Sequence, residues 1–122
     1  MGYITDAGLP TFMLTHWTRD RSRGPLLGLE EIVRRQTSHT ASVYGLKDRG
    51  LLRPGFKADI NIIDYAQLAC DAPYMAYDLP TGGKRLLQKA RGYVATLVAG
   101  QTIYEQGQPT GALPGALVRG HP

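Results

Sequence analysis

The chain has 122 residues and a mass of 13.3 kDa, a length that fits one domain or part of one. Hydrophobic residues make up 43% and charged residues 20%, a balance that excludes a disordered chain and a membrane-spanning helix. The net charge is +4, but residues 1–64 hold nine basic and seven acidic side chains and residues 65–122 hold five and three. This even spread argues against a basic arm that binds nucleic acid.

The first half of the chain predicts a loop followed by helices. Residues 2–5 predict a strand fragment that ends at Asp6, and residues 7–28 show no sustained period and predict a long loop. Apolar residues at helical spacing predict a helix over residues 29–37. Thr37 or Ser38 is then expected to cap a second short helix that Gly45 ends.

The second half predicts antiparallel strands. Residues 57–64 alternate with period two, so Ala58, Ile60 and Ile62 are expected on one face of a strand. Pro54 and Gly55 suit the centre of a type II turn just before it.

Three further strands are expected later in the chain, over residues 85–90, 93–99 and 102–105. Gly100 and Gln101 are the predicted two-residue hairpin turn. The tail from residue 107 to 122 is rich in Gly and Pro, and we expect it to run extended over a surface.

The N-terminal sequence and the single cysteine favour a reducing compartment. MGYITDAGLP has neither the basic start nor the apolar stretch of a secretory signal. Cys70 has no second cysteine for a disulfide, and we interpret it as a packing residue. We therefore expect a cytoplasmic protein with no membrane partner.

The residues by themselves indicate little catalytic chemistry. His16, His39 and His121 lack the spacing of a metal site. Asp6 follows a short apolar stretch and precedes Ala-Gly, which is where barrel enzymes place working groups, but an Asp at such a position is also a common turn or cap residue.

Several segments together resemble the C-terminal end of an amidohydrolase, in the N-acyl-D-amino-acid deacylase or D-aminoacylase-like branch. The resemblance rests on TDAG at residues 5–8, TFMLTHW at 11–17, EIVRRQT at 31–37, GLLRPGFKADINIID at 50–64 and TGALPGALVRG at 110–120. The pattern at residues 50–64 is shared widely across amidohydrolases, whereas the final segment is narrower and resembles the tail of the deacylase-like branch.

The resemblance implies an α+β fold: residues 1–50 as the last βα unit of a TIM barrel, and residues 51–122 as part of a small antiparallel β-sandwich. In such a protein the loop over residues 7–28 overhangs the mouth of the barrel. His16, Trp17 and Arg19 are therefore candidate substrate-binding residues. The alternative is that Trp17 anchors the loop and the arginines are solvated.

The resemblance also implies a mechanism. Asp6 matches the family's catalytic aspartate, which lies beside or binds a zinc ion and shuttles a proton from water to the leaving nitrogen. The family's other zinc ligands come from strands that precede this position. We therefore expect zinc in the complete enzyme and none held by these 122 residues alone, which are expected to be inactive.

Two functions remain at this point. The first is the C-terminal piece of a metal-dependent amidohydrolase that hydrolyses the amide bond of N-acyl-D-amino acids, with a small-molecule substrate as its partner. The alternative is a non-catalytic β-rich structural or oligomerisation module, because exposed apolar faces invite a second copy. Both are compatible with the homo-oligomer that we expect.

Overall fold

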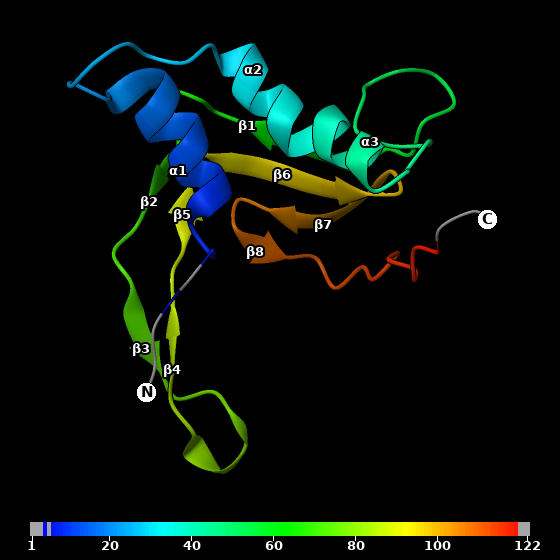
Figure 1. The fold of residues 1–122 in the computed structure, drawn as a ribbon. Coiled ribbons are helices and arrows are strands. Elements are labelled where there is room, and N and C mark those ends of the chain that lie inside the picture. Colours follow the sequence, from blue (N-terminus) through cyan, green and yellow to red (C-terminus); the bar gives the residue numbers. More distant parts are fainter. Residues whose placement is uncertain (1–3, 5, 120–122) are drawn as a thin grey trace.

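The computed structural model describes residue 4 and residues 6–119, and it places helices before antiparallel strands (Figure 1). The helical segments are α1 (Leu9–Thr15), η1 (His16–Asp20), α2 (Leu29–Arg34), η2 (Arg35–His39), α3 (Thr40–Val43) and the short η3 (Pro80–Gly82). The strands are β1 (Ile60–Ile63), β2 (Ala69–Cys70), β3 (Tyr74–Ala76), β4 (Arg85–Leu87), β5 (Ala90–Arg91), β6 (Tyr93–Val98), β7 (Gln101–Glu105) and β8 (Gln108–Pro109). The α+β class is therefore confirmed. The strand predicted over residues 2–5 lies outside the described residues apart from Ile4, which is irregular.

The predicted loop over residues 7–28 is wrong for its first half, where α1 and η1 form one helical run. Pro10 suggested a loop, but it sits in the first turn of α1, where its missing N–H costs nothing. Thr11 and Thr15 are one turn apart and buried, and the Thr15 hydroxyl donates to the Thr11 carbonyl over 3.0 Å. Because the buried face of this helix is made of threonines, the sequence shows no hydrophobic periodicity that would predict a helix here.

The two separate helices predicted between residues 29 and 45 are also wrong, because α2, η2 and α3 run on without a break. Thr37 does not cap a new helix: its hydroxyl donates back to the Val33 carbonyl over 2.7 Å. The Thr40 hydroxyl does the same to Arg35 over 2.5 Å. These bonds satisfy carbonyls along a π-helical turn, so the helix continues through it. Gly45 ends it with a positive φ of 69°, as expected.

The strands form one four-stranded sheet and two short ribbons. The sheet has the order β1-β6-β7-β8, and β2 pairs with β5 and β3 with β4, all antiparallel. The helices lie along one side of the sheet, and the β3–β4 ribbon extends away from it as an arm (Figure 1). The single strand predicted over residues 85–90 is thus divided between the arm and the β2–β5 ribbon.

The predicted strand over residues 57–64 is confirmed in part as β1. Ile60 and Ile62 pair in regular register with Leu97 and Ala95, so they share one face as expected, although Ile60 is half-buried and Ile62 exposed. The register shifts between Ile62 and Ile63, where β6 holds one extra residue, Val94. Such a bulge disrupts the pairing locally.

The turns follow the glycines with one shift in register. The turn at Pro54 and Gly55 is confirmed by a positive φ at Gly55 and a 3.2 Å bond from the Phe56 amide to the Arg53 carbonyl. The β6–β7 turn is made by Ala99 and Gly100, both with positive φ, and not by Gly100 and Gln101. Ala99 is held in this conformation because its amide donates to Asp59 Oδ1 over 2.9 Å.

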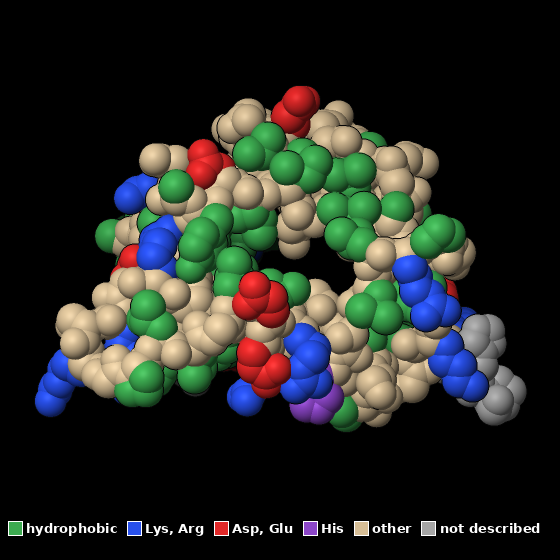
Figure 2. All heavy atoms as spheres, turned by 90° about the horizontal axis from the view of Figure 1, so that it is seen from above, with side chains coloured by type: hydrophobic (Ala, Val, Ile, Leu, Met, Phe, Trp, Pro, Cys, Tyr) green, Lys and Arg blue, Asp and Glu red, His purple; other side chains and the backbone are tan. Residues whose placement is uncertain are grey.

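The core lies between the helices and the sheet and is small. Ile32 and Leu68 are fully buried and Ala41 nearly so. Thr11 joins this layer to β6 through a 2.8 Å hydrogen bond with the Tyr93 hydroxyl. Many other hydrophobic side chains reach the surface, as Figure 2 shows for one face. None of the described helices has the length and apolar character needed to cross a membrane.

Candidate functional site

Asp6 stands at the entrance to α1 with its side chain exposed. Its backbone carbonyl accepts a 3.1 Å bond from the Leu9 amide, which begins the first turn. Its φ is 67°, a left-handed conformation that Asp adopts more readily than most residues. Among the described residues nothing pairs with its carboxylate in an ion pair or hydrogen bond, so the side chain is available for chemistry.

The segment after Asp6 is packed against the β2–β5 ribbon. The Cys70 thiol lies 3.5 Å from the Gly8 carbonyl oxygen. A Cβ added to Gly8 would lie 2.7 Å from Gln88 Oε1, so the end of the Gln88 side chain would have to shift to make room. Gln88 Nε2 donates to the Asp71 carbonyl over 2.9 Å. The backbone next to Asp6 therefore lies in close contact with a distant part of the chain.

His16 and Trp17 form a small aromatic group at the other end of α1. The His16 ring stacks on Phe12 with centroids 4.7 Å apart and meets Trp17 edge-on at 5.3 Å. The Arg21 guanidinium lies over the Trp17 ring at 4.7 Å. Both His16 and Trp17 are half-buried, so part of each ring stays open to solvent. This group offers a flat apolar surface with a cation at one side.

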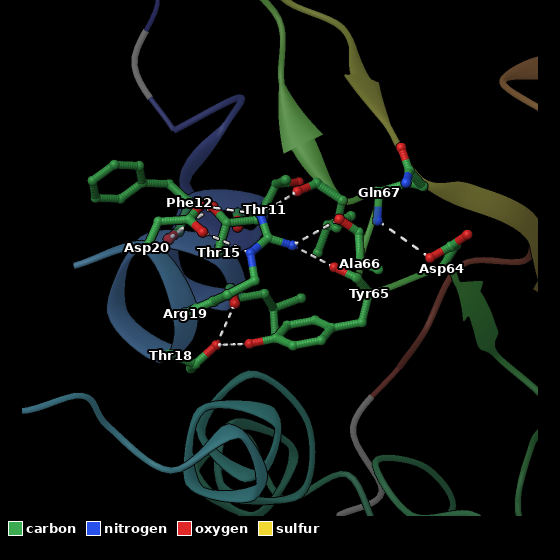
Figure 3. Close-up of polar contacts among 12 residues, drawn as sticks. Thr11, Phe12, Thr15, Thr18, Arg19, Asp20, Asp64, Tyr65, Ala66 and Gln67 are labelled. Carbon is green, nitrogen blue, oxygen red and sulfur yellow. Dashed lines mark hydrogen bonds and ion pairs between the residues drawn. The ribbon is translucent and has the colours of Figure 1, made fainter. Parts of the chain in front are cut away.

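Arg19 crosses from η1 to the turn that follows β1 (Figure 3). Its guanidinium donates to the Tyr65 carbonyl and, over 2.8 Å, to the Leu68 carbonyl. It also pairs with Asp20 at 2.6 Å, a hydrogen bond that lowers the pKa of the Asp20 carboxyl. Arg19 thus ties the helices to the β1–β2 connection. A role in binding a substrate carboxylate stays a prediction, and a substrate would have to compete with these contacts.

A second bond reinforces this junction. The Thr18 hydroxyl donates to the Leu14 carbonyl and lies 2.6 Å from the Tyr65 hydroxyl (Figure 3). Asp64 shapes the same turn, because its Oδ1 accepts a 3.2 Å bond from the Gln67 amide. Sequence reasoning did not single out Thr18 or Tyr65. No periodicity or motif marks them, since their roles depend on contacts between segments about 47 residues apart.

The candidate residues do not form one group. Asp6 precedes α1, whereas His16, Trp17 and Arg19 follow it. At 1.5 Å per residue, about 10–15 Å of helix separates them. A single small substrate could contact Asp6 and the aromatic group only if it spanned that length.

The described residues do not compose a metal centre. No group of three or more His, Cys, Asp or Glu side chains comes together anywhere in residues 4 and 6–119. A catalytic zinc takes three protein ligands, and Asp6 supplies one carboxylate at most. The zinc implied by the resemblance therefore does not fit the residues that this structure describes, and no step of the chemistry is derived through it.

A search of known protein families matches residues 3–104 to the model described as Amidohydrolase family. Similar curated proteins include an N-acyl-D-aspartate deacylase of Alcaligenes xylosoxydans xylosoxydans, 34% identical over 71% of this chain and 16% of that protein. An N-acyl-D-glutamate deacylase of the same organism is 35% identical over 77% of this chain and 17% of its own length. A dihydroorotase of Lactobacillus acidophilus is 29% identical over 82% of this chain and 24% of its own.

A solved structure agrees with these matches. A crystal structure of D-aminoacylase, described as defining a novel subset of amidohydrolases, superposes with a TM-score of 0.64 at 30% identity. It covers 84% of this chain and 19% of the D-aminoacylase chain. This chain thus spans a quarter or less of the relatives it matches. Because the family match extends over most of its length, the chain belongs to the amidohydrolase family.

Proposed function

We propose that this chain is the C-terminal part of a metal-dependent amidohydrolase that hydrolyses the amide bond of N-acyl-D-amino acids. The proposal is supported by family membership, by the two deacylase relatives and by the D-aminoacylase structure. The dihydroorotase relatives are 27–29% identical against 34–35% for the deacylases, but they align over 82% of this chain against 71–77%. The D-aminoacylase structure supports the deacylase reaction over that of a dihydroorotase.

The observation that carries the proposal is the exposed Asp6 carboxylate with no partner among the described residues, at the start of α1, where the Asp6 carbonyl accepts the Leu9 amide. A carboxylate oxygen of Asp6 would accept a proton from the attacking water and deliver it to the leaving amide nitrogen. General acid and base catalysis by a positioned carboxylate contributes about 10²–10⁴ in rate. Zinc is proposed only for the complete enzyme, where its protein ligands would come from residues outside this chain.

For His16, Trp17 and Arg19 we propose a role in binding the substrate and none in the proton transfer. The half-open rings of His16 and Trp17 would pack against the side chain or the acyl group. If Arg19 binds the substrate carboxylate, Arg19→Ala in the complete enzyme raises KM for a carboxylate substrate. An unchanged KM would leave Arg19 with only its contacts to Tyr65 and Leu68.

The test is to express the complete reading frame that contains this sequence and to assay N-acetyl-D-aspartate and N-acetyl-D-glutamate against their L isomers. Asp6→Asn keeps the size of the side chain and removes the proton acceptor. We expect kcat to fall at least about 100-fold with little change in KM.

Asp78→Asn is the matched control, because it makes the same change on the β3–β4 connection, where Asp78 pairs with Arg85 at 2.6 Å. It should leave kcat unchanged. Full activity of Asp6→Asn would refute the role of Asp6, and equal turnover of the L isomers would refute the stereochemical part of the proposal.

A second function has one specific observation in its favour. The accessible surface is 9253 Å², whereas a compact monomer of this mass exposes about 6,500 Å². The excess includes apolar side chains on the arm, among them Met75 and Tyr77, and on the tail, such as Leu113. This favours a β-rich module that self-associates and buries those side chains.

The mass of the chain in solution distinguishes a self-associated module from a monomer. If the 122-residue chain covers its own surface, light scattering should give a dimer or larger species that dissociates on dilution. A monomer at all concentrations would refute the homo-oligomer. Hydrolysis of an N-acyl-D-amino acid by the purified chain would instead refute the expectation that it is inactive alone.

A further inference from the structure

A pocket of about 250 Å³ lies far from Asp6, where three separate parts of the chain meet. They are the connection that leads from α3 to β1, the β6–β7 turn at Val98 and Ala99, and the tail over residues 114–119. Main-chain bonds hold the first two of these parts together. The Lys57 amide donates to the Asp48 carbonyl over 2.8 Å, and the Gly100 amide donates to the Ala58 carbonyl over 2.9 Å.

The charged residues that line the pocket are unequal in number. Four are basic and two acidic: Lys47, Arg49, Lys57 and Arg119 against Asp48 and Asp59. Figure 2 shows Lys and Arg side chains at several places on one face of the molecule. The pocket therefore carries an excess of two positive charges, which favours anions over cations.

Both acids are already engaged by neighbouring groups. Asp48 pairs with Arg49 at 3.1 Å and with Lys57 at 3.7 Å, and the hydrogen bond from Arg49 lowers its pKa. Asp59 pairs with Arg49 at 3.4 Å and accepts the Ala99 amide. These ion pairs neutralise Arg49 and Lys57. They also hold Arg49 in place, with only 18% of its side chain exposed.

The other two cations have no such partner. Within residues 4 and 6–119 no ion pair involves Lys47 or Arg119, which reach the pocket from opposite walls. Gly115 and Ala116 lie on the same wall as Arg119, and both are exposed. An oxyanion in the pocket would meet two cations that form no ion pair among the described residues.

We propose that this pocket binds a small dianion, a phosphate monoester or a dicarboxylate, between Lys47 and Arg119. Two negative charges would match the two uncompensated positive charges. The ion-paired Arg49 would keep the walls apart in the absence of ligand. The proposal does not depend on the hydrolysis proposed above, because neither Asp6 nor its sequence neighbours are among the residues that line the pocket.

The test is isothermal titration of the 122-residue chain at low salt with inorganic phosphate, succinate and acetate. We expect saturable binding of phosphate, succinate or both with a dissociation constant on the order of 1 mM, and weaker binding of acetate. Phosphate alone would identify a phosphate monoester as the ligand class, and succinate alone a dicarboxylate. No saturation by either at about 10 mM, or equal binding of acetate, would overturn the proposal.

Variants locate the site. Lys47→Ala and Arg119→Ala remove exposed side chains without ion pairs, so both should fold, and each should weaken binding at least about threefold. Lys84→Ala, on the arm, is the matched control and should not change it. Equal effects of the control and the two pocket variants would show nonspecific attraction and overturn the proposal. Amide resonances of Gly115 and Ala116 should shift on titration, and shifts confined to other segments would contradict it.

Discussion

The helical layer and the β3–β4 arm differ in where their apolar side chains go. In the helical layer Ile32 is fully buried, and Leu68 in the β1–β2 connection is also fully buried. In the arm Tyr74 and Met75 stay open to solvent although they lie in a paired strand. The layer is therefore stabilised by burial across distant segments, while the arm depends on its own main-chain bonds. A two-stranded ribbon with such support alone is marginal in water.

The largest effect is expected where main chain meets main chain, at Gly92. Its φ is +92°, and an added Cβ would lie 2.6 Å from Leu68 Cα and 2.7 Å from its amide nitrogen. Backbone atoms in the core junction cannot give way, so Gly92→Ala should destabilise the chain by about 3 kcal/mol or more, as measured by urea unfolding. Gly107→Ala is the control, since Gly107 also has a positive φ but no atom within 4 Å. It should cost about 1 kcal/mol, and equal losses would contradict the steric argument.

Truncation of the core should come next. Ile32→Ala removes a fully buried side chain and should cost about 2–5 kcal/mol in the same measurement. Leu113→Ala removes an aliphatic side chain that is 94% exposed, and should change stability by less than about 0.5 kcal/mol. If Leu113→Ala proved as costly as Ile32→Ala, the tail would be buried in solution, and the comparison above would need a self-associated state.

A smaller effect is expected at the junction made by Arg19. Arg19→Ala leaves the Leu68 carbonyl without its side-chain donor and should lower Tm and speed hydrogen exchange in the β1–β2 turn. Arg19→Lys should give a Tm between those of the unchanged protein and Arg19→Ala, because a Lys ammonium cannot donate two parallel hydrogen bonds as a guanidinium does. Arg91→Ala is the control, since Arg91 pairs only with Asp71 on the surface. A larger drop in Tm for Arg91→Ala than for Arg19→Ala would show that the junction does not depend on this side chain.

The smallest effect concerns pH and the surface of α2. Hydrogen bonds from Arg34 and Arg35 lower the pKa of Glu31 from 4.5 to about 2. Because the folded pKa lies below the unfolded one, this contribution to stability is present above pH 4.5 and is lost as the pH falls towards about 2. Glu31→Gln should reduce the loss of helical circular dichroism in that range, and 1 M salt should do the same. Identical acid transitions in both proteins would show that the pair contributes nothing.

Local chemistry explains which elements were predictable. β1 and the turn at Gly55 follow from alternation and from a glycine at the left-handed position. The helical run through α1 and η1 did not, because its buried face is formed by Thr11 and Thr15. The continuous helix through η2 also depends on hydroxyls that donate back to main-chain carbonyls, as Thr37 does to Val33. A sequence pattern does not reveal whether a threonine hydroxyl caps a new helix or donates back to a carbonyl of the preceding turn.

The candidate site divides in the same way. The role of Asp6 was implied by a family resemblance that rested on five segments spread along the chain, and the family is confirmed over residues 3–104. The contacts of Arg19 with the β1–β2 turn join segments about 47 residues apart, so they were not visible in the sequence. The charged pocket was missed for the same reason: Lys47 and Arg119 are 72 positions apart, and neither belongs to a motif of its own.

The sequence by itself determined the order of helices before antiparallel strands, the glycine turns and the family. These depend on residue periodicity, on backbone preferences and on motifs within short segments, which neighbouring residues specify. Only the tertiary structure decided that Gly92 lies against Leu68 and that Arg19 binds the β1–β2 turn. It also decided that Lys47 and Arg119 line one pocket with two acids that pair with other cations. Such contacts depend on the path of the chain in three dimensions, because distance along a sequence places no limit on which side chains meet.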